Sequence, residues 1–147
     1  MARLPGSVLY VCSLNRVRSP MAAGLTRRLY GDAMRVDSCG LQPSDEVDFM
    51  AASVMTEIGV DLSAHQPRSL ADMPASSFGL IVALSSEAWG AVQVLDRQDG
   101  PELAHWPVED PTVGEGSRET RLETYRKVRR DLETRITQRF GPPAEWE

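Results

Sequence analysis

The chain has 147 residues, of which 41% are hydrophobic and 25% charged, a composition typical of a globular protein with one domain over residues 1–147. Acidic residues outnumber basic ones by 21 to 16, and the net charge of −5 argues against a general nucleic-acid-binding protein. No apolar run is long enough to span a membrane, the first residues do not resemble a secretory signal, and two cysteines are too few for a disulfide scaffold. We therefore expect a cytoplasmic protein with reduced thiols that binds neither nucleic acid nor membrane.

Short apolar segments alternate along the chain with helix-forming segments. Strands are predicted at 7–12, 35–38, 80–84 and 102–106, where β-branched or apolar residues are bounded by glycine or polar residues. Helices are predicted between them, with Ser19 capping the first, then 45–58, then from Ser85 or Ser86 to about 95, and finally 117–140. This alternation predicts an α/β fold, a four-stranded parallel sheet with helices on both faces.

The segment after the first strand has the pattern of a phosphate-binding loop. Cys12 ends the strand, five residues separate it from Arg18, and Ser19 and Pro20 follow where a helix begins. This spacing lets backbone N–H groups curl around a tetrahedral anion, while Arg18 grips two of its oxygens and Ser19 donates a hydrogen bond to the sulfur. The predicted phosphate-binding residues are Ser13, Leu14, Asn15, Arg16, Val17 and Arg18.

A buried structural thiol is the ordinary fate of a cysteine at the end of a core strand. Cys39 serves as an internal comparison, because the residue six positions after it is Asp45 rather than an arginine. The helix N-terminus and Arg18 both favour a thiolate at Cys12, which makes it the candidate nucleophile.

These residues resemble the low-molecular-weight protein tyrosine phosphatases, whose fold thioredoxin- and mycothiol-linked arsenate reductases share. The likeness extends from Ser7 to about Phe140, and the segments that carry it are 8–12 with Asn15, Arg18, Ser19, Pro20 and Met21, then 37–40, 59–65, Arg68, 78–81 and 109–111. The resemblance implies a three-layer sandwich with Cys12 as nucleophile, Arg18 as phosphate ligand and Asp110 as general acid. It also implies that Asn15, Ser38 and His65 support the loop.

Asp110 has an argument of its own, because a phosphate monoester needs a proton on its leaving group and a base to activate water. A loop after the last strand reaches the edge where Cys12 lies. The alternative is a simple Asp-Pro turn in which the carboxylate caps its own backbone. No metal or other cofactor is implied, because Arg18 and backbone dipoles supply the positive charge.

Several positions depart from the usual pattern of the family. Leu14 stands where glycine is common, which predicts strain if its φ is positive, and added bulk at the mouth of the site. Arg16 adds charge beside the anion, and Val17 replaces a second loop cysteine. Thr112 and Val113 replace paired tyrosines, and no aromatic wall is evident, so a preference for phosphotyrosine is in doubt.

The main hypothesis is a cysteine-dependent phosphomonoester hydrolase of the protein tyrosine phosphatase type, with a phosphocysteine intermediate. Its substrate is a phosphorylated protein or a small phosphomonoester. The alternative is an arsenate reductase that uses an external small thiol, since Cys39 alone cannot complete a two-thiol relay in the chain. A third hypothesis is a phosphoanion-binding module without turnover. Cys39, expected just after the second strand, is also a candidate for an oxidative crosslink to Cys12.

Overall fold

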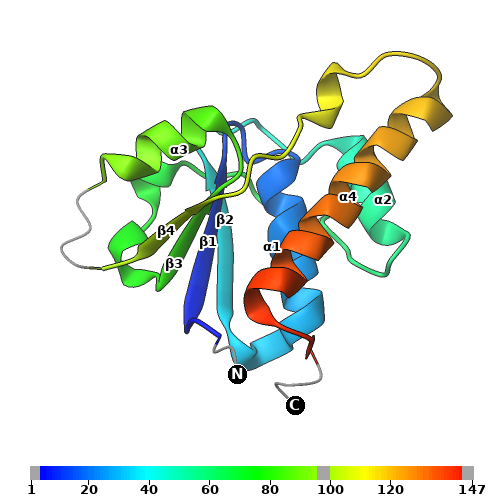
Figure 1. Ribbon diagram of the computed structural model, residues 1–147. Helices are drawn as coiled ribbons and strands as arrows, with labels where there is room; N and C mark the ends of the chain where they lie inside the picture. Colours follow the sequence, from blue (N-terminus) through cyan, green and yellow to red (C-terminus); the bar gives the residue numbers. More distant parts are fainter. Residues whose placement is uncertain (1–3, 96–99, 144–147) are drawn as a thin grey trace.

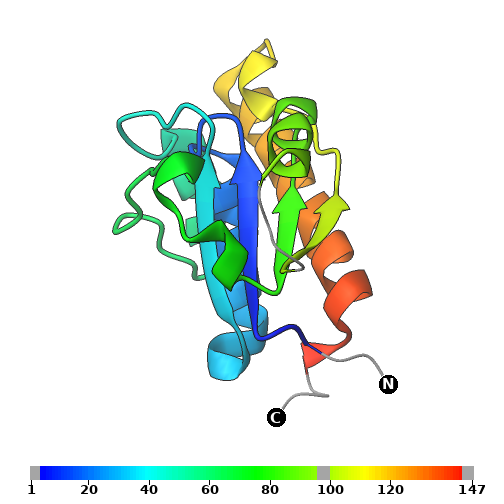
Figure 2. The ribbon, with the colours of Figure 1, turned by 90° about the vertical axis from the view of Figure 1, so that its left-hand side faces the viewer.

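The computed structural model describes residues 4–95 and 100–143. Four strands form one parallel sheet: β1 (Ser7–Cys12), β2 (Arg35–Gly40), β3 (Leu80–Ala83) and β4 (Glu102–His105). Their order across the sheet is β2-β1-β3-β4, and the arrowheads in Figure 2 all point the same way. All carboxyl ends therefore meet at one edge, where β1 lies between β2 and β3.

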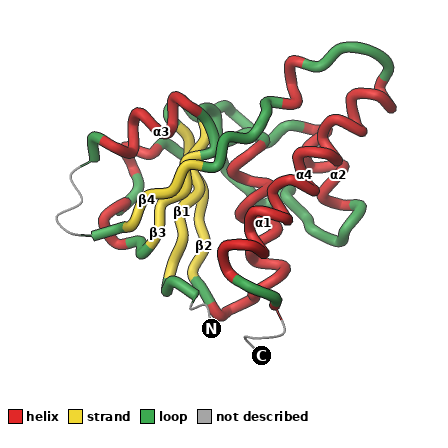
Figure 3. The backbone as a smooth tube through the Cα atoms, in the orientation of Figure 1, coloured by secondary structure: helices red, strands yellow, loops and turns green. Residues whose placement is uncertain are grey.

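Helices cover both faces of the sheet, as the alternating pattern predicts (Figures 1 and 3). The helices α1 (Arg18–Tyr30), α2 (Phe49–Thr56) and α4 (Arg118–Phe140) bury one face, and α3 (Ser86–Gln93) with two 3₁₀ turns covers the other. The α/β fold and its three layers are confirmed. Within the described residues, no helix combines the length and the apolar character needed to cross a membrane.

The central strand β1 is buried along its whole length because its side chains enter both cores. Val8, Tyr10 and Cys12 face α1 and α4, whereas Leu9 and Val11 face the α3 side. Since successive side chains of a strand alternate between faces, a strand covered on both sides needs an uninterrupted apolar run. This explains why the ends of β1 agree with the sequence prediction.

Three predicted boundaries near the loop that follows β1 are wrong. The first helix begins at Arg18, so Ser19 lies inside it and does not cap it. The helix predicted at 45–58 begins only at Phe49, because the Asp48 carboxylate caps it by accepting the N–H of Ala51 at 3.1 Å. Strand β2 extends two residues beyond its predicted end and includes Cys39.

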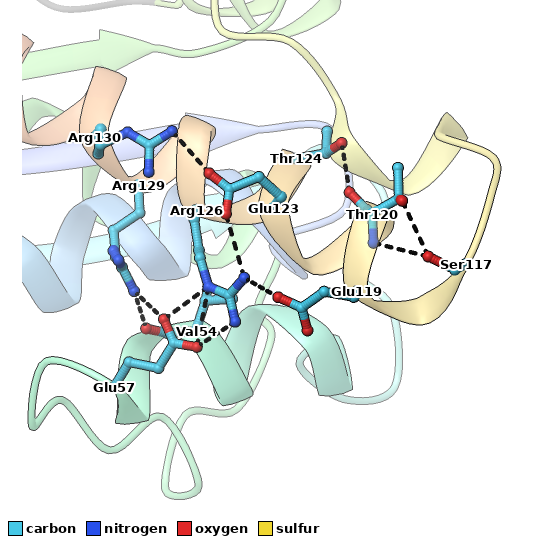
Figure 4. Close-up of polar contacts among 10 residues, drawn as sticks. All are labelled: Val54, Glu57, Ser117, Glu119, Thr120, Glu123, Thr124, Arg126, Arg129 and Arg130. Atoms are coloured by element: carbon cyan, nitrogen blue, oxygen red, sulfur yellow. Dashed lines mark hydrogen bonds and ion pairs between the residues drawn. The ribbon is translucent and has the colours of Figure 1, made fainter.

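Helix α2 is fixed to α4 by a group of charged side chains (Figure 4). The Glu57 carboxylate accepts hydrogen bonds from Arg126 at 2.8 Å and from Arg129 at 2.8 Å. Arg126 also pairs with Glu119 at 2.7 Å and with Glu123 at 3.2 Å. The alternating charges of the last helix thus include a contact that holds α2 against α4.

Candidate active site

An open pocket of about 240 Å³ lies at the carboxyl edge of the sheet, beyond the end of β1. The chain leaves β1 through α1 toward β2 on one side, and it later places β3 on the other side. Ligands of open α/β sheets bind at such a reversal of strand order. The pocket is lined by Cys12, Ser13, Leu14, Arg16, Val17, Arg18, Glu87, Asp110 and Thr112.

The loop from Cys12 to Arg18 is oriented by the segment 41–48, which takes up its carbonyl groups. Backbone N–H groups of this segment donate to the carbonyls of Cys12, Ser13, Leu14 and Arg16 at 2.9–3.2 Å. In a trans peptide the next N–H points away from the carbonyl, so these contacts turn the loop amides toward the pocket. The N-terminus of α1 adds its dipole, and together they form a nest for an anion.

Cys12 is 2% exposed and its sulfur is surrounded by hydrogen-bond donors. The Ser19 hydroxyl oxygen lies 2.9 Å from Sγ, and the Asn15 backbone N–H donates to Sγ at 3.3 Å. Both contacts stabilise a thiolate when Ser19 donates its proton. The predicted contact between Ser19 and the sulfur is therefore present, whereas the predicted cap of α1 by Ser19 is not.

Asn15 holds the loop from behind and is fully buried. Its Nδ2 donates to Ser19 Oγ at 2.8 Å and to Ser38 Oγ at 3.0 Å, while Oδ1 accepts the backbone N–H of Arg68 at 3.0 Å. His65 Nε2 lies 3.2 Å from the same Oδ1, so Nε2 must carry the proton in the neutral ring. Burial lowers the pKa of His65 below its ordinary value, which favours that neutral form.

Arg18 and Arg16 both line the pocket but differ in their partners. Arg18 donates from Nη1 to the carbonyl oxygen of Val108 at 3.0 Å, a neutral partner that leaves its charge uncompensated. Arg16 places Nη2 3.3 Å from the Asp48 carboxylate, whose residue is only 8% exposed. The extra charge predicted beside the anion is therefore largely neutralised, and Arg18 is the dominant cation.

Asp110 reaches the pocket from the loop after β4, and its orientation is fixed by Thr112. Oδ1 accepts the Thr112 backbone N–H at 2.9 Å and the Thr112 hydroxyl at 2.7 Å. The capping turn considered in the sequence is thus present, and it holds the carboxylate beside Cys12 and Arg18. The turn and the pocket position occur together and do not exclude each other.

Leu14 lies at the mouth of the pocket, and its predicted strain is absent. Among the described non-glycine residues only Asn15 has a positive φ, of 51°, so Leu14 takes an ordinary conformation. Its side chain is 43% exposed and adds apolar bulk at the entrance. Asparagine tolerates the left-handed region better than most residues, which explains its place in the loop.

Two lining residues, Glu87 and Thr112, were not predicted as part of the site. Thr112 was noted only as a replacement, although Asp-x-Thr is a common capping pattern. Glu87 lies in the first turn of α3, directly after β3 ends at the same sheet edge. Its place directly after a predicted strand could have indicated that Glu87 belongs to the site. His105, the last residue of β4, and Trp106, which follows it, are not among the described residues that line the pocket. His105 stacks on Trp89 at 5.2 Å, and Trp106 lies 6.0 Å from Tyr10.

The geometry contradicts the crosslink between Cys12 and Cys39. Cys39 pairs with Val11 in the sheet register and lies with it in the core on the α3 side. Cys12 pairs with Gly40 and faces the opposite core, so the sheet separates the two thiols. Burial raises the pKa of Cys39 to about 12, which keeps it a protonated, unreactive thiol.

Within residues 4–95 and 100–143, no three histidine, cysteine, aspartate or glutamate side chains gather into a group that could hold a metal ion. Positive charge at the pocket is supplied by the side chains of Arg18 and Arg16 and by the loop amides.

Residues 7–142 match the low molecular weight phosphotyrosine protein phosphatase family. The chain belongs to this family. Its curated relatives include arsenate reductases.

An arsenate reductase of Halalkalibacterium halodurans is 29% identical over 129 residues, which cover 88% of this chain and 91% of the relative. Among solved structures, an arsenate reductase from Archaeoglobus fulgidus superposes with a TM-score of 0.73 at 26% identity, covering 91% of this chain and 98% of the other. The tyrosine phosphatase AmsI of Erwinia amylovora superposes with a TM-score of 0.77 at 22% identity, covering 92% and 91% of the two chains. The last likeness concerns the fold alone.

Proposed function

We propose that the protein hydrolyses phosphomonoesters through a phosphocysteine intermediate on Cys12. The observation that carries this proposal is the pocket position of Asp110, a carboxylate fixed by Thr112 beside the nucleophile and Arg18. A pure anion-binding site gains nothing from a carboxylate next to the anion, because the two negative charges repel each other. A hydrolase needs such a group to donate a proton to the leaving oxygen.

In the first step the Cys12 thiolate attacks phosphorus in line with the leaving oxygen. The S–P bond forms as the P–O bond to the leaving group breaks, and Asp110 gives that oxygen its proton. The loop amides and Arg18 bind the equatorial oxygens, where charge accumulates. In the second step Asp110, now ionised, takes a proton from water as the water attacks phosphorus. The S–P bond then breaks, inorganic phosphate is released, and Ser19 stabilises the departing thiolate.

The lining of the pocket argues against a strong preference for phosphotyrosine. None of the nine described residues that line the pocket is aromatic, so this part of the chain offers a substrate ring no stacking partner there. Small or extended phosphomonoesters therefore suit the site better than an aromatic one does.

Arsenate reduction is the second candidate, because the Halalkalibacterium relative is an arsenate reductase. Arsenate has the shape and charge of phosphate, so Cys12 can form an S–As bond with loss of water. An external thiol then attacks Cys12 Sγ, so that the S–As bond breaks, its electron pair reduces As(V) to As(III), and a disulfide forms between Cys12 and that thiol. A second thiol must reduce this disulfide to regenerate Cys12. Because Cys39 lies on the other face of the sheet, both of these thiols must be external.

The test is the metal-free hydrolysis of p-nitrophenyl phosphate and of phenyl phosphate, which has a poorer leaving group. We expect Cys12→Ser to abolish the turnover of both substrates. Asp110→Asn should lower kcat by about 10²–10⁴-fold for phenyl phosphate and less for p-nitrophenyl phosphate, because p-nitrophenolate needs the proton less. The matched control is Glu115→Gln. It removes an exposed carboxylate that lies five residues after Asp110 and is not among the described residues that line the pocket, and it should leave both rates unchanged.

Absence of turnover in the wild type, with tight binding of arsenate, would contradict the hydrolase proposal. Arsenite formation is then measured with a small external thiol such as mycothiol present. Arsenite that depends on both Cys12 and the thiol identifies a reductase. Anion binding without either product identifies the third hypothesis, a module that binds phosphoanions without turnover.

A further inference from the structure

Glu87 lines the pocket, but the proposed mechanism gives it no role. It lies in the first turn of α3, whose N-cap is Ser85, and it lines the same pocket as Cys12 and Arg18. The Ser13 hydroxyl donates to Glu87 Oε2 over 3.4 Å, so the carboxylate borders the loop one residue from the nucleophile. Among the ion pairs of the described residues, none includes Glu87.

The other charged groups of the pocket are all accounted for. Arg16 is paired with Asp48, and Arg18 is the cation available to an oxyanion. Asp110 is held by Thr112, and it is protonated when it acts as the acid of the first step. Among the described residues that line this pocket, Glu87 is thus the carboxylate with neither an ion-pair partner nor a role in the proposed mechanism.

An unpaired carboxylate beside an anion site discriminates between substrates by their charge. It repels a phosphate dianion with a neutral organic group, and this lowers affinity for such a substrate. It attracts a substrate that carries its own cation close to the phosphoryl group, because the cation is placed between two negative charges. Specificity arises from the repulsive arrangement as much as from the attractive one.

We propose that Glu87 selects phosphoryl substrates whose organic group bears an ammonium or guanidinium a few atoms from phosphorus. This inference rests on the proposed function and names its substrate class. A neighbouring pocket offers space for the organic group of such a substrate. A second open pocket of about 340 Å³ continues past Glu87, shares Arg18 with the first, and is bordered by Glu109. Glu109 differs from Glu87 because Lys127 already compensates its charge.

The test compares two isosteric phosphonates that the enzyme cannot hydrolyse, 2-aminoethylphosphonate and n-propylphosphonate. They differ by an ammonium in place of a methyl group. Dissociation constants are measured by calorimetry at low ionic strength for the wild type and for Glu87→Gln. We expect the preference for the aminoethyl ligand to be about fivefold lower in Glu87→Gln, the size expected of an exposed ion pair. Taking the ratio within each variant cancels intrinsic differences between the two ligands.

Two variants and one condition control the comparison. Glu109→Gln should keep the wild-type preference, and Glu87→Asp should keep most of it because the charge remains. Raising the salt concentration should weaken the preference of the wild type. Circular dichroism and thermal melting of each variant separate a change in specificity from a change in folding.

Each other outcome overturns the inference in a recognisable way. If the preference is unchanged in Glu87→Gln, or if Glu109→Gln changes it equally, Glu87 does not select the substrate. A lower melting temperature with an unchanged preference assigns Glu87 a structural role in the first turn of α3. If the wild type binds neither phosphonate, the anion site itself fails and the proposed function fails with it. Binding does not require turnover, so the two failures are distinguishable.

Discussion

Replacement of Asn15 by alanine and by glycine tests whether this side chain holds the loop from Cys12 to Arg18 together. Asn15 is fully buried, has a φ of 51°, and forms four side-chain hydrogen bonds with Ser19, Ser38, His65 and the backbone of Arg68. Both variants remove all four bonds. Only alanine also places a Cβ on a backbone in the left-handed region.

The expected loss follows from these contacts. Four hydrogen bonds at about 1 kcal/mol each amount to about 4 kcal/mol. The Ser19 hydroxyl keeps its contacts with Cys12 Sγ and the Cys39 carbonyl, which lowers the expected loss to about 3 kcal/mol for Asn15→Gly. Alanine adds strain of about 1–2 kcal/mol in this conformation, while glycine pays about 0.5–1 kcal/mol more entropy on folding. Asn15→Ala should therefore be less stable than Asn15→Gly by about 0.5–1 kcal/mol.

The assay is urea denaturation, in which 3 kcal/mol shifts the midpoint by roughly 1–2 M for a slope near 2 kcal/mol/M. Gly90→Ala in α3 is the matched control, because a Cβ there meets no atom within 4 Å and the φ is ordinary. At that position alanine should be more stable than glycine by about 0.5–1 kcal/mol. The reasoning is refuted if Asn15→Ala is as stable as Asn15→Gly, or if both lose less than about 1 kcal/mol.

Three further predictions concern residues around the site and the helices. Gly40→Ala should cost about 1–3 kcal/mol and weaken phosphate binding, since its Cβ would lie 2.6 Å from the Asn15 backbone nitrogen; unchanged binding by calorimetry would contradict this. The pKa of His65 is lowered by burial from its ordinary 6.5, so stability should fall as the pH drops below about 6.5, where the unfolded chain takes up the proton more readily. Thermal melts of His65→Gln should not show this part of the loss of stability. The pKa of Glu57 is lowered to about 2 by hydrogen bonds from Arg126 and Arg129. The free energy of unfolding of the wild type should therefore exceed that of Glu57→Gln by at most about 1 kcal/mol at pH 7 after solvent screening. This difference should vanish as the pH falls from about 4.5 to about 2. A difference that persists at the lower pH would disprove the pairing.

The fold could be predicted from the sequence wherever local pattern and burial agree. Strand β1 is apolar on both faces and its ends were predicted correctly, as was α4, which Ser117 caps and Gly141 ends. The start of α2 could not be predicted in this way. The stretch before Phe49 has helical spacing, but the Asp48 backbone N–H donates to the carbonyl of Arg16 and the Asp48 carboxylate caps α2 by accepting the N–H of Ala51. A distant contact overrides the local preference at that point.

The candidate site also contains some residues that could be predicted from the sequence and others that could not. Cys12, Arg18 and the loop amides lie within one short segment, so their spacing alone indicates an anion site. Glu87 comes from the first turn of α3, after β3, and Thr112 from the 3₁₀ turn after β4. Only the parallel sheet brings them to that edge. Ser19 was predicted both as a helix cap and as a donor to the sulfur, and the structure has only the contact with the sulfur. Local statistics favour serine as a cap, whereas the contact with Cys12 follows from the spacing of the loop.

The register of the sheet also limits which chemistry Cys12 can perform. Cys39 is one position short of the residue paired with Cys12, and a shift of one residue in a strand reverses the face on which a side chain lies. The residue paired with Cys12 is Gly40, and a side chain there would collide with the backbone of Leu14 and Asn15. A second thiol on this strand therefore cannot reach the pocket without displacing the loop that binds the anion. Hydrolysis needs no second thiol, whereas reduction of an oxyanion on Cys12 requires electrons from thiols outside this strand. This asymmetry favours hydrolysis as the reaction that the chain can complete alone.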